Sequence, residues 1–202
     1  MELHWVPFYT VTHFHQFPFW NPYKCGGMPM LGNPQSRILT PFFIVQLLFG
    51  PLIGTHIEII AHLAIAFAGA YLLARSLRQS RLAAIACGGV FAGSSWFSLH
   101  VAVGHATFMG AAYIPWVLAI FWLGVRRRPL ASGAAAGFLV ALILLEGGIY
   151  PAAYAMLMLA MVAIALSVEH RKAIPLAALV VVVTFAVAFS APKWQPLRRK
   201  ML

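Results

Sequence analysis

The chain has 202 residues, of which 62% are hydrophobic and 9% are charged, and its formal net charge is +10. A soluble domain carries about 25% charged residues, so this composition leaves too little polar surface for a water-soluble globule. The basic residues lie in short clusters between apolar segments, which is typical of membrane proteins and argues against a nucleic-acid partner. Apolar stretches of about 17–25 residues cross the hydrocarbon core of a bilayer, and they recur here. We therefore expect an all-α fold, a polytopic transmembrane helix bundle.

The first 37 residues are polar and aromatic and contain no segment that could span a membrane. Within them, the run from His15 to Arg37 holds four prolines and three glycines. Each proline removes a backbone amide donor and restricts the preceding residue, so this run cannot form one helix. Its low charge and many aromatic residues are not typical of disorder. We expect residues 1–37 to form a folded, irregular external loop region.

The rest of the chain is mostly apolar. Residues 38–54 are too short for a good span and are interrupted by Pro41, Gly50 and Pro51, so we expect a re-entrant or interfacial helix. A short basic tail over residues 193–202 ends the chain. Between them, residues 55–192 are expected to form a transmembrane bundle of about six helices, with spans near 56–74, 82–103, 107–124, 130–146, 149–168 and 173–190.

The connections between these spans alternate in charge. Basic clusters follow the first, third and fifth spans, whereas the connections at Gly104 and Gly147 carry no Lys or Arg. Because short basic loops stay in the cytoplasm, this pattern places the uncharged connections and residues 1–37 on the outer side. Small residues over 132–137 are typical of a helix-packing surface.

Few side chains could carry chemistry. Glu146 ends an apolar span, where an acid is either part of a site or an interfacial charge. Glu58 lies four residues before His62, so the two share a helix face as a structural contact or as a proton-handling or ligand-binding pair. His105 lies in an outer connection five residues after His100, which is a weak metal signal without a third ligand.

These polar residues map to the outer ends of the predicted spans, together with Tyr150, Lys193 and the external loop. Polar groups are costly at membrane depth, so their one-sided clustering predicts a site at the outer face. Tyr113 and the outer tryptophans fit an aromatic belt or the core better than a sugar platform.

Four segments carry a resemblance to a known family. They are the loop HQFPFWNPYKCGGMPMLGNPQSRILTP, the segment GTHIEIIAHLAIAFAGAYLLARSLRQSRLAA, the turn GHATFMGAAYIPW and the step LLEGGIYP. In this order, from about His15 to about Pro196, they resemble the YfhO-like bacterial polytopic membrane proteins. That family is related to the GT-C glycosyltransferases, which use polyprenyl-phosphate-linked sugars. The resemblance implies a multi-pass protein of the bacterial inner membrane with an active site at its outer face.

Such a protein would transfer a sugar from a polyprenyl-phosphate donor in the membrane lipid to an acceptor. We expect catalysis by Glu58, His62, His105 and Glu146, and substrate binding by Asn21, Asn33, Gln35, Arg37, Tyr150 and Lys193. Arg37 or Lys193 would offset the charge of the lipid phosphate. No cofactor is identified, and a divalent metal is compatible with this chemistry.

The chain departs from the family at both ends. Family members usually begin with a transmembrane helix that leads into an acidic motif, whereas Glu2 is the only acid here before the Pro/Trp block. At the other end, the match at Pro192, Lys193 and Pro196 is followed by the end of the chain. We therefore expect a fragment of a longer enzyme, which could be inactive. The alternative is a non-catalytic lipid or solute transporter or flippase-like subunit, in which Glu58 and His62 handle protons.

Overall fold

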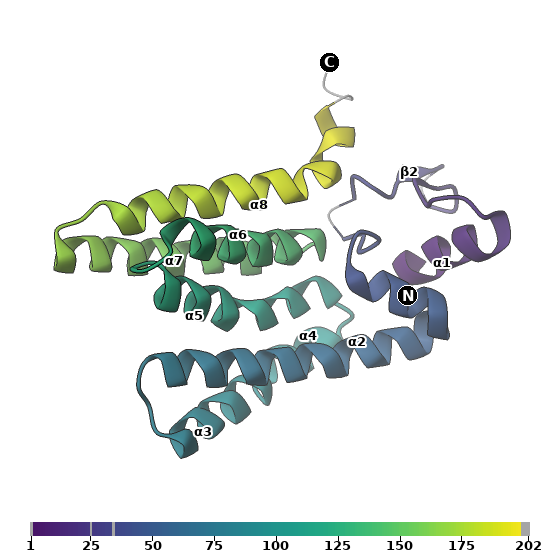
Figure 1. The fold of residues 1–202 in the computed structure, drawn as a ribbon. Helices are drawn as coiled ribbons and strands as arrows, with labels where there is room; N and C mark the ends of the chain where they lie inside the picture. Colours follow the sequence, from purple (N-terminus) through teal and green to yellow (C-terminus); the bar gives the residue numbers. More distant parts are fainter. Residues whose placement is uncertain (1, 25, 34, 199–202) are drawn as a thin grey trace.

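The computed structural model describes residues 2–24, 26–33 and 35–198, and it consists almost entirely of helices (Figure 1). The predicted all-α helix bundle is thereby confirmed. Within the described residues, five helical segments are long and apolar enough to cross a membrane: Pro41–Ser76, Arg81–Ala102, Ala106–Gly124, Ile149–His170 and Ile174–Lys193. A sixth apolar helix, α6 (Pro129–Leu145), is shorter. The chain thus has the architecture of a multi-pass membrane protein.

The expected external loop region begins with a helix, α1 (Glu2–Phe14), which the sequence did not predict. Its residues are mostly aromatic and β-branched and have only moderate helix propensity, so the local signal was weak. Packing against α2 (Pro41–Ser76) supplies the stability that helix propensity does not, and Val6 is buried in this contact. After α1 the chain forms a small hairpin in which β1 (Trp20–Asn21) pairs antiparallel with β2 (Met28–Pro29).

The long helix α2 contains a sharp kink at Gly50. Gly50 has a φ of 81°, which favours glycine, and the following Pro51 has no amide hydrogen to donate. The two limbs of α2 touch beyond the kink, because a Cβ on Gly54 would lie 2.6 Å from the Cα of Gln46. Residues 38–54 therefore do not form a separate element, since they include the short first limb of α2 and the start of its second limb.

The predicted spans 82–103 and 107–124 are each built from two helices. A break at Gly93 and Ser94 divides the first into α3 (Arg81–Ala92) and α4 (Ser95–Ala102). The second begins as a 3₁₀ helix, η1 (Ala106–Tyr113), and continues as α5 (Ile114–Gly124).

The last three helices form the tightest part of the bundle. Helix α6 packs between α5 and α8 (Ile174–Arg198), and α7 (Ile149–His170) covers both α5 and α8. The glycines of α6 allow this approach, because a Cβ on Gly133 or Gly137 would lie 2.8 or 2.6 Å from a carbonyl oxygen of α8. The predicted helix-packing surface over 132–137 is thus confirmed. Fully buried apolar side chains fill the space between these helices, among them Val117, Phe121, Val140, Leu159 and Val182.

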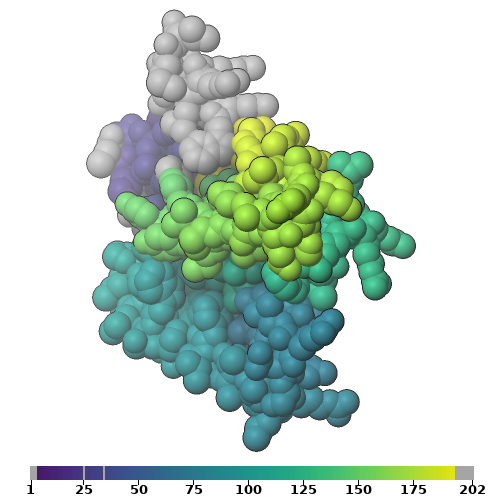
Figure 2. Space-filling model, turned by 90° about the vertical axis from the view of Figure 1, so that its left-hand side faces the viewer, coloured from purple at the N-terminus to yellow at the C-terminus, as the bar shows by residue number. Residues whose placement is uncertain are grey.

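The turns of the bundle divide between its two ends (Figure 1). The turns that follow α2, α5 and α7, which hold the basic clusters, lie at one end. Figure 2 views the molecule from that end, with α2 and α3 below and α7 and α8 above. The turns that follow α4 and α6 lie at the other end, beside α1 and the hairpin. The separation of basic and uncharged connections therefore holds in the fold, and their assignment to the two membrane faces stays a prediction.

Candidate functional site

A group of buried polar side chains occupies the end of the bundle next to α1 and the hairpin. We call it the polar cluster, and it consists of Arg37, Gln46, Glu58, His62, Tyr113, Glu146 and Lys193. The exposed fraction is 0% for Glu58, 1% for His62 and Glu146, and 4% for Lys193. The fold thus brings together five of the predicted site residues from the loop before α2, from α2, from the turn after α6 and from α8. Ionisable groups buried this deeply need partners, because an unpaired charge in a low-dielectric interior is costly.

Arg37 and the kink of α2 together hold the carboxylate of Glu58. Two turns in the loop position Arg37. Ser36 N–H donates to Asn33 O at 3.0 Å, and Thr40 N–H donates to Arg37 O at 3.1 Å. Arg37 Nη2 then forms an ion pair with Glu58 Oε1. From the other limb of α2, Gln46 Nε2 donates to Glu58 Oε2 at 3.0 Å. Both oxygens of Glu58 are therefore occupied within the protein.

The guanidinium of Arg37 retains unused donors. Its Nε and Nη1 are buried and have no hydrogen-bond partner among the described residues. A buried donor without a partner costs about 1–3 kcal/mol. Planar guanidinium donors suit the oxygens of a phosphate or carboxylate, so the unused donors of Arg37 match the chemistry of an anion.

His62 pairs with Glu146 across the bundle. His62 Nε2 lies 3.0 and 3.1 Å from the two carboxyl oxygens of Glu146, and Tyr113 OH donates to Glu146 Oε1 at 3.4 Å. His62 Nδ1 lies 2.8 Å from the backbone carbonyl oxygen of Glu58, which can only accept, so Nδ1 carries a proton. A second proton must then lie between Nε2 and the carboxyl group, either on the imidazole or on Glu146. The pair can move this proton without moving any heavy atom.

This pairing refines the expected pair of Glu58 and His62. The two residues are adjacent on α2, as their spacing predicts, yet His62 bonds only the backbone of Glu58. The carboxylate of Glu58 is held by Arg37, and the ring of His62 extends to a carboxylate 84 residues later.

Lys193 connects three segments at the edge of the polar cluster. Its Nζ donates to Ser36 O at 3.0 Å, to Leu144 O at 3.1 Å and to Leu145 O at 2.8 Å. Leu144 and Leu145 end α6, where the helix dipole favours a cation. An ammonium group has three N–H donors, and all three are used here. Lys193 thereby fixes the neighbours of Arg37 and Glu146 in place.

The other predicted substrate-binding residues of the loop shape its turns. Asn21 and Asn33 are buried, and their Oδ1 atoms accept hydrogen bonds of 2.9 Å from the backbone N–H of Tyr23 and Gln35. The side chain of Gln35 is exposed. These contacts position the chain that leads to Arg37.

His105 and Tyr150 lie apart from the polar cluster, in an aromatic group at the surface. Phe108 stacks on Tyr150 with ring centroids 5.9 Å apart, and the rings of His100 and His105 are 6.3 Å apart. In the described part of the chain, no hydrogen bond links His105 or Tyr150 to the polar cluster.

Two members of the polar cluster were missed by the sequence argument. Gln46 is the only polar side chain in an otherwise apolar stretch over 41–54, and a polar group at membrane depth is a usable signal. Tyr113 gave no such signal, because a tyrosine near the end of a span fits an aromatic belt equally well.

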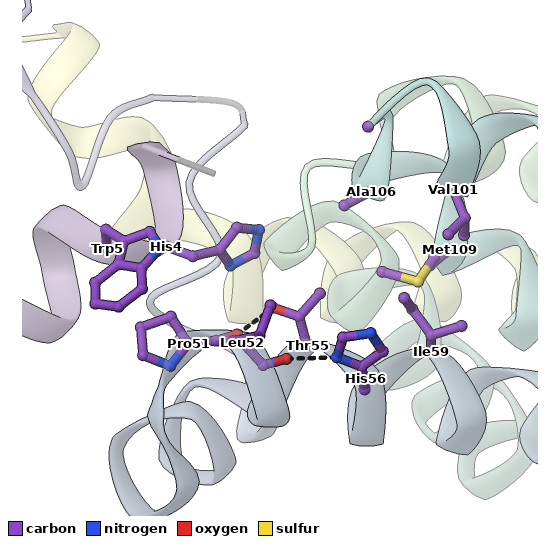
Figure 3. A pocket seen from close by; sticks show the side chains of 11 residues that line it. His4, Trp5, Pro51, Leu52, Thr55, His56, Ile59, Val101, Ala106 and Met109 are labelled. Atoms are coloured by element: carbon purple, nitrogen blue, oxygen red, sulfur yellow. Dashed lines mark hydrogen bonds between the residues drawn. The ribbon is translucent and has the colours of Figure 1, made fainter.

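A pocket opens beside the polar cluster, between α1, the second limb of α2 and the α4–η1 turn (Figure 3). Its volume is about 240 Å³, and His4, Trp5, Leu52 and His56 are among the residues that line it. His4 connects the pocket to the polar cluster, since its Nδ1 lies 3.2 Å from Gln46 Oε1. Burial lowers the pKa of His4, and the charge of Arg37 lowers it further against the opposing effect of the Gln46 hydrogen bond.

The site therefore offers a proton-sharing pair, an arginine with unused donors and an adjoining pocket. Within the described ranges, no three His, Cys, Asp or Glu side chains are grouped so that they could hold a metal ion. Comparison of the chain with protein-family models, with curated proteins and with solved structures found no match.

Proposed function

We propose that this chain is a glycosyltransferase-like protein that transfers a sugar from a polyprenyl-phosphate donor at the outer face of a bacterial inner membrane. The observation that carries the proposal is the composition of the polar cluster. It places a proton-sharing pair, His62 and Glu146, beside a buried arginine whose free donors suit a phosphate. Glu58 joins the two, because Arg37 binds its carboxylate and His62 binds its backbone carbonyl. The resemblance to the YfhO-like proteins supports the same chemistry.

The reaction needs a base and a cation. An acceptor hydroxyl gives its proton to the His62–Glu146 pair while its oxygen forms a bond to the anomeric carbon of the sugar. The bond between that carbon and the phosphate oxygen breaks, and its electron pair leaves with the phosphate. Arg37 Nε and Nη1 stabilise the negative charge that develops on the leaving group.

The test is sugar transfer from polyprenyl-phosphate-linked sugars by the chain in proteoliposomes. Glu146→Gln keeps an amide in hydrogen-bond contact with His62 and removes the carboxyl group that shares a proton with it. We expect it to lower turnover about 100-fold or more, as for loss of a general acid–base group. Glu169→Gln is the matched control, because the side chain of Glu169 is 62% exposed in the last turn of α7. Absence of transfer by the unmodified chain, or full turnover in Glu146→Gln, would overturn the proposal.

A second candidate function is proton-coupled movement of a lipid or solute. It is favoured by the burial of the His62–Glu146 pair, because a proton carrier inside a bundle must be shielded from water until the coupled step. The discriminating measurement is proton flux across vesicles that contain an anionic lipid substrate and no sugar donor. Flux that Glu146→Gln abolishes would support transport, whereas sugar transfer without flux would support the transferase.

A further inference from the structure

The pocket beside the polar cluster has an unusual hydrogen-bonding character. Its walls are mostly apolar and include Trp5, Leu52, Ile59 and Met109. Three polar side chains line it, namely His4, Thr55 and His56 (Figure 3). Each of them already donates its hydrogen in a hydrogen bond to another group of the protein.

Two of these hydrogen bonds go to backbone carbonyl oxygens of α2. Thr55 OH donates to Pro51 O at 2.6 Å, and His56 Nδ1 lies 2.8 Å from Leu52 O. A carbonyl oxygen only accepts, so the proton of a neutral His56 imidazole is on Nδ1 and its Nε2 carries a lone pair.

The tautomer of His4 follows from the polar cluster. Gln46 Nε2 donates to the carboxylate of Glu58, so Gln46 Oε1 is the end of the amide that faces His4 Nδ1 at 3.2 Å. An amide oxygen only accepts, which makes His4 Nδ1 the donor. Burial lowers the pKa of His4 and so favours the neutral imidazole, in which Nε2 also carries a lone pair.

The side chains of the pocket therefore present acceptors, apart from the indole N–H of Trp5, which is the one remaining side-chain donor among the lining residues. A phosphate or carboxylate presents only acceptors, so a single indole N–H would leave most of its oxygen lone pairs desolvated against apolar walls without compensation. An alcohol brings the O–H donor that the imidazole lone pairs need, and its one oxygen can accept from a single donor. The polar cluster has the opposite hydrogen-bonding character to the pocket, because the unused groups of Arg37 are all donors.

We propose that this pocket binds the sugar acceptor, an amphiphile in which one hydroxyl group, other than the one that reacts, donates to Nε2 of His4 or of His56 while its apolar body packs on Trp5 and Leu52. Its identity as the acceptor rests on the proposed function, whereas the selection of alcohols over anions does not. The phosphate of the donor then belongs at Arg37, and the bonds from His4 through Gln46 to Glu58 connect the two halves of the site.

The test uses diethyl pyrocarbonate, which acylates unprotonated imidazole nitrogens, on the full chain in lipid nanodiscs. At about pH 8 an ordinary histidine, with a pKa of about 6.5, is neutral. We expect n-decanol to protect His4 and His56 several-fold, as measured by mass spectrometry of the modified peptides. Decyl phosphate, which has the same tail, should give no protection, and the exposed His15 should react equally in all samples.

A matched pair of variants checks that protection arises in the pocket. Val101→Trp fills the pocket, whereas Val103→Trp adds the same ring at an exposed position two residues later. Protection by n-decanol should be lost in the first variant and kept in the second. Equal protection by decyl phosphate, no protection by n-decanol, or the same result in both variants would overturn the inference. Because this readout needs no turnover, selective alcohol binding without sugar transfer would refute only the proposed function.

Discussion

The pairing of His62 with Glu146 can be tested by two substitutions of Glu146, one that keeps its hydrogen-bond contacts and one that removes them. Glu146→Gln replaces the carboxyl group with an amide of nearly equal shape. Its Nε2 can donate to a neutral His62 Nε2, and its oxygen can still accept from Tyr113 OH. Glu146→Ala removes both contacts and leaves the buried imidazole and hydroxyl without this partner.

The expected magnitudes follow from those contacts. In Glu146→Gln the number of hydrogen bonds is unchanged and only their charge assistance is lost, so the free energy of unfolding should fall by about 1 kcal/mol. In Glu146→Ala a side chain that is 1% exposed is deleted and His62, also 1% exposed, loses its charge partner. Breaking a buried pair by removing one partner costs about 3–5 kcal/mol.

Unfolding in mixed micelles with increasing dodecyl sulfate, followed by circular dichroism, measures both values. His62→Gln combined with each substitution completes a double-mutant cycle. A loss in Glu146→Gln as large as in Glu146→Ala would show that a full ion pair is required and would refute proton sharing. A negligible loss in Glu146→Ala would refute the pairing itself.

Three further predictions concern the scaffold. Gly137→Ala should lower the free energy of unfolding by about 1–3 kcal/mol, because the added methyl group overpacks against α8. Gly89→Ala should instead stabilise α3 by about 0.5–1 kcal/mol, because no atom lies within 4 Å of the added Cβ. Chemical unfolding of both variants measures the two changes. Because burial depresses the pKa of His4, the docking of α1 should be stable above the ordinary histidine pKa of about 6.5 and should weaken as the pH falls below it. Hydrogen exchange of α1 amides between about pH 7.5 and about pH 5.5 should show this loosening, and His4→Gln should be insensitive to pH over that range. In a chain without native cysteines, a membrane-impermeant maleimide should label Trp20→Cys and spare Arg127→Cys in intact spheroplasts, and labelling of both from the same side would contradict the proposed orientation.

Much of the fold could be predicted because lipid imposes simple rules. Spans follow from apolar length and turns follow from charge, so α6 (Pro129–Leu145) and α7 (Ile149–His170) lie close to the predicted spans 130–146 and 149–168. The acids Glu58 and Glu146 could be predicted as site residues, because a carboxylate is rare in an apolar segment.

The contacts of the site depend on geometry that the sequence does not express. Gln46 reaches Glu58 only because Gly50 and Pro51 fold the two limbs of α2 together. Helix α1 forms against a surface that exists only after folding, so local propensity did not reveal it. His105 was grouped with the site because it shares an end of the bundle with Glu146, but a shared end does not establish contact.

The charges of the polar cluster bear on which lipid the proposed transferase would bind. Arg37 neutralises Glu58, and the His62–Glu146 pair is neutral as a unit wherever its proton lies. The ammonium of Lys193 is left over, held by carbonyl dipoles and by no carboxylate within the described residues. The polar cluster therefore holds one positive charge in excess, and in a low-dielectric interior an anion of a single charge would relieve that cost. A polyprenyl-phosphate-linked sugar is a phosphodiester with one negative charge, whereas the phosphomonoester left after transfer carries nearly two. The proton taken from the acceptor balances this second charge while it stays on the His62–Glu146 pair, so charge balance favours release of the spent lipid by the proposed transferase only after that proton has left.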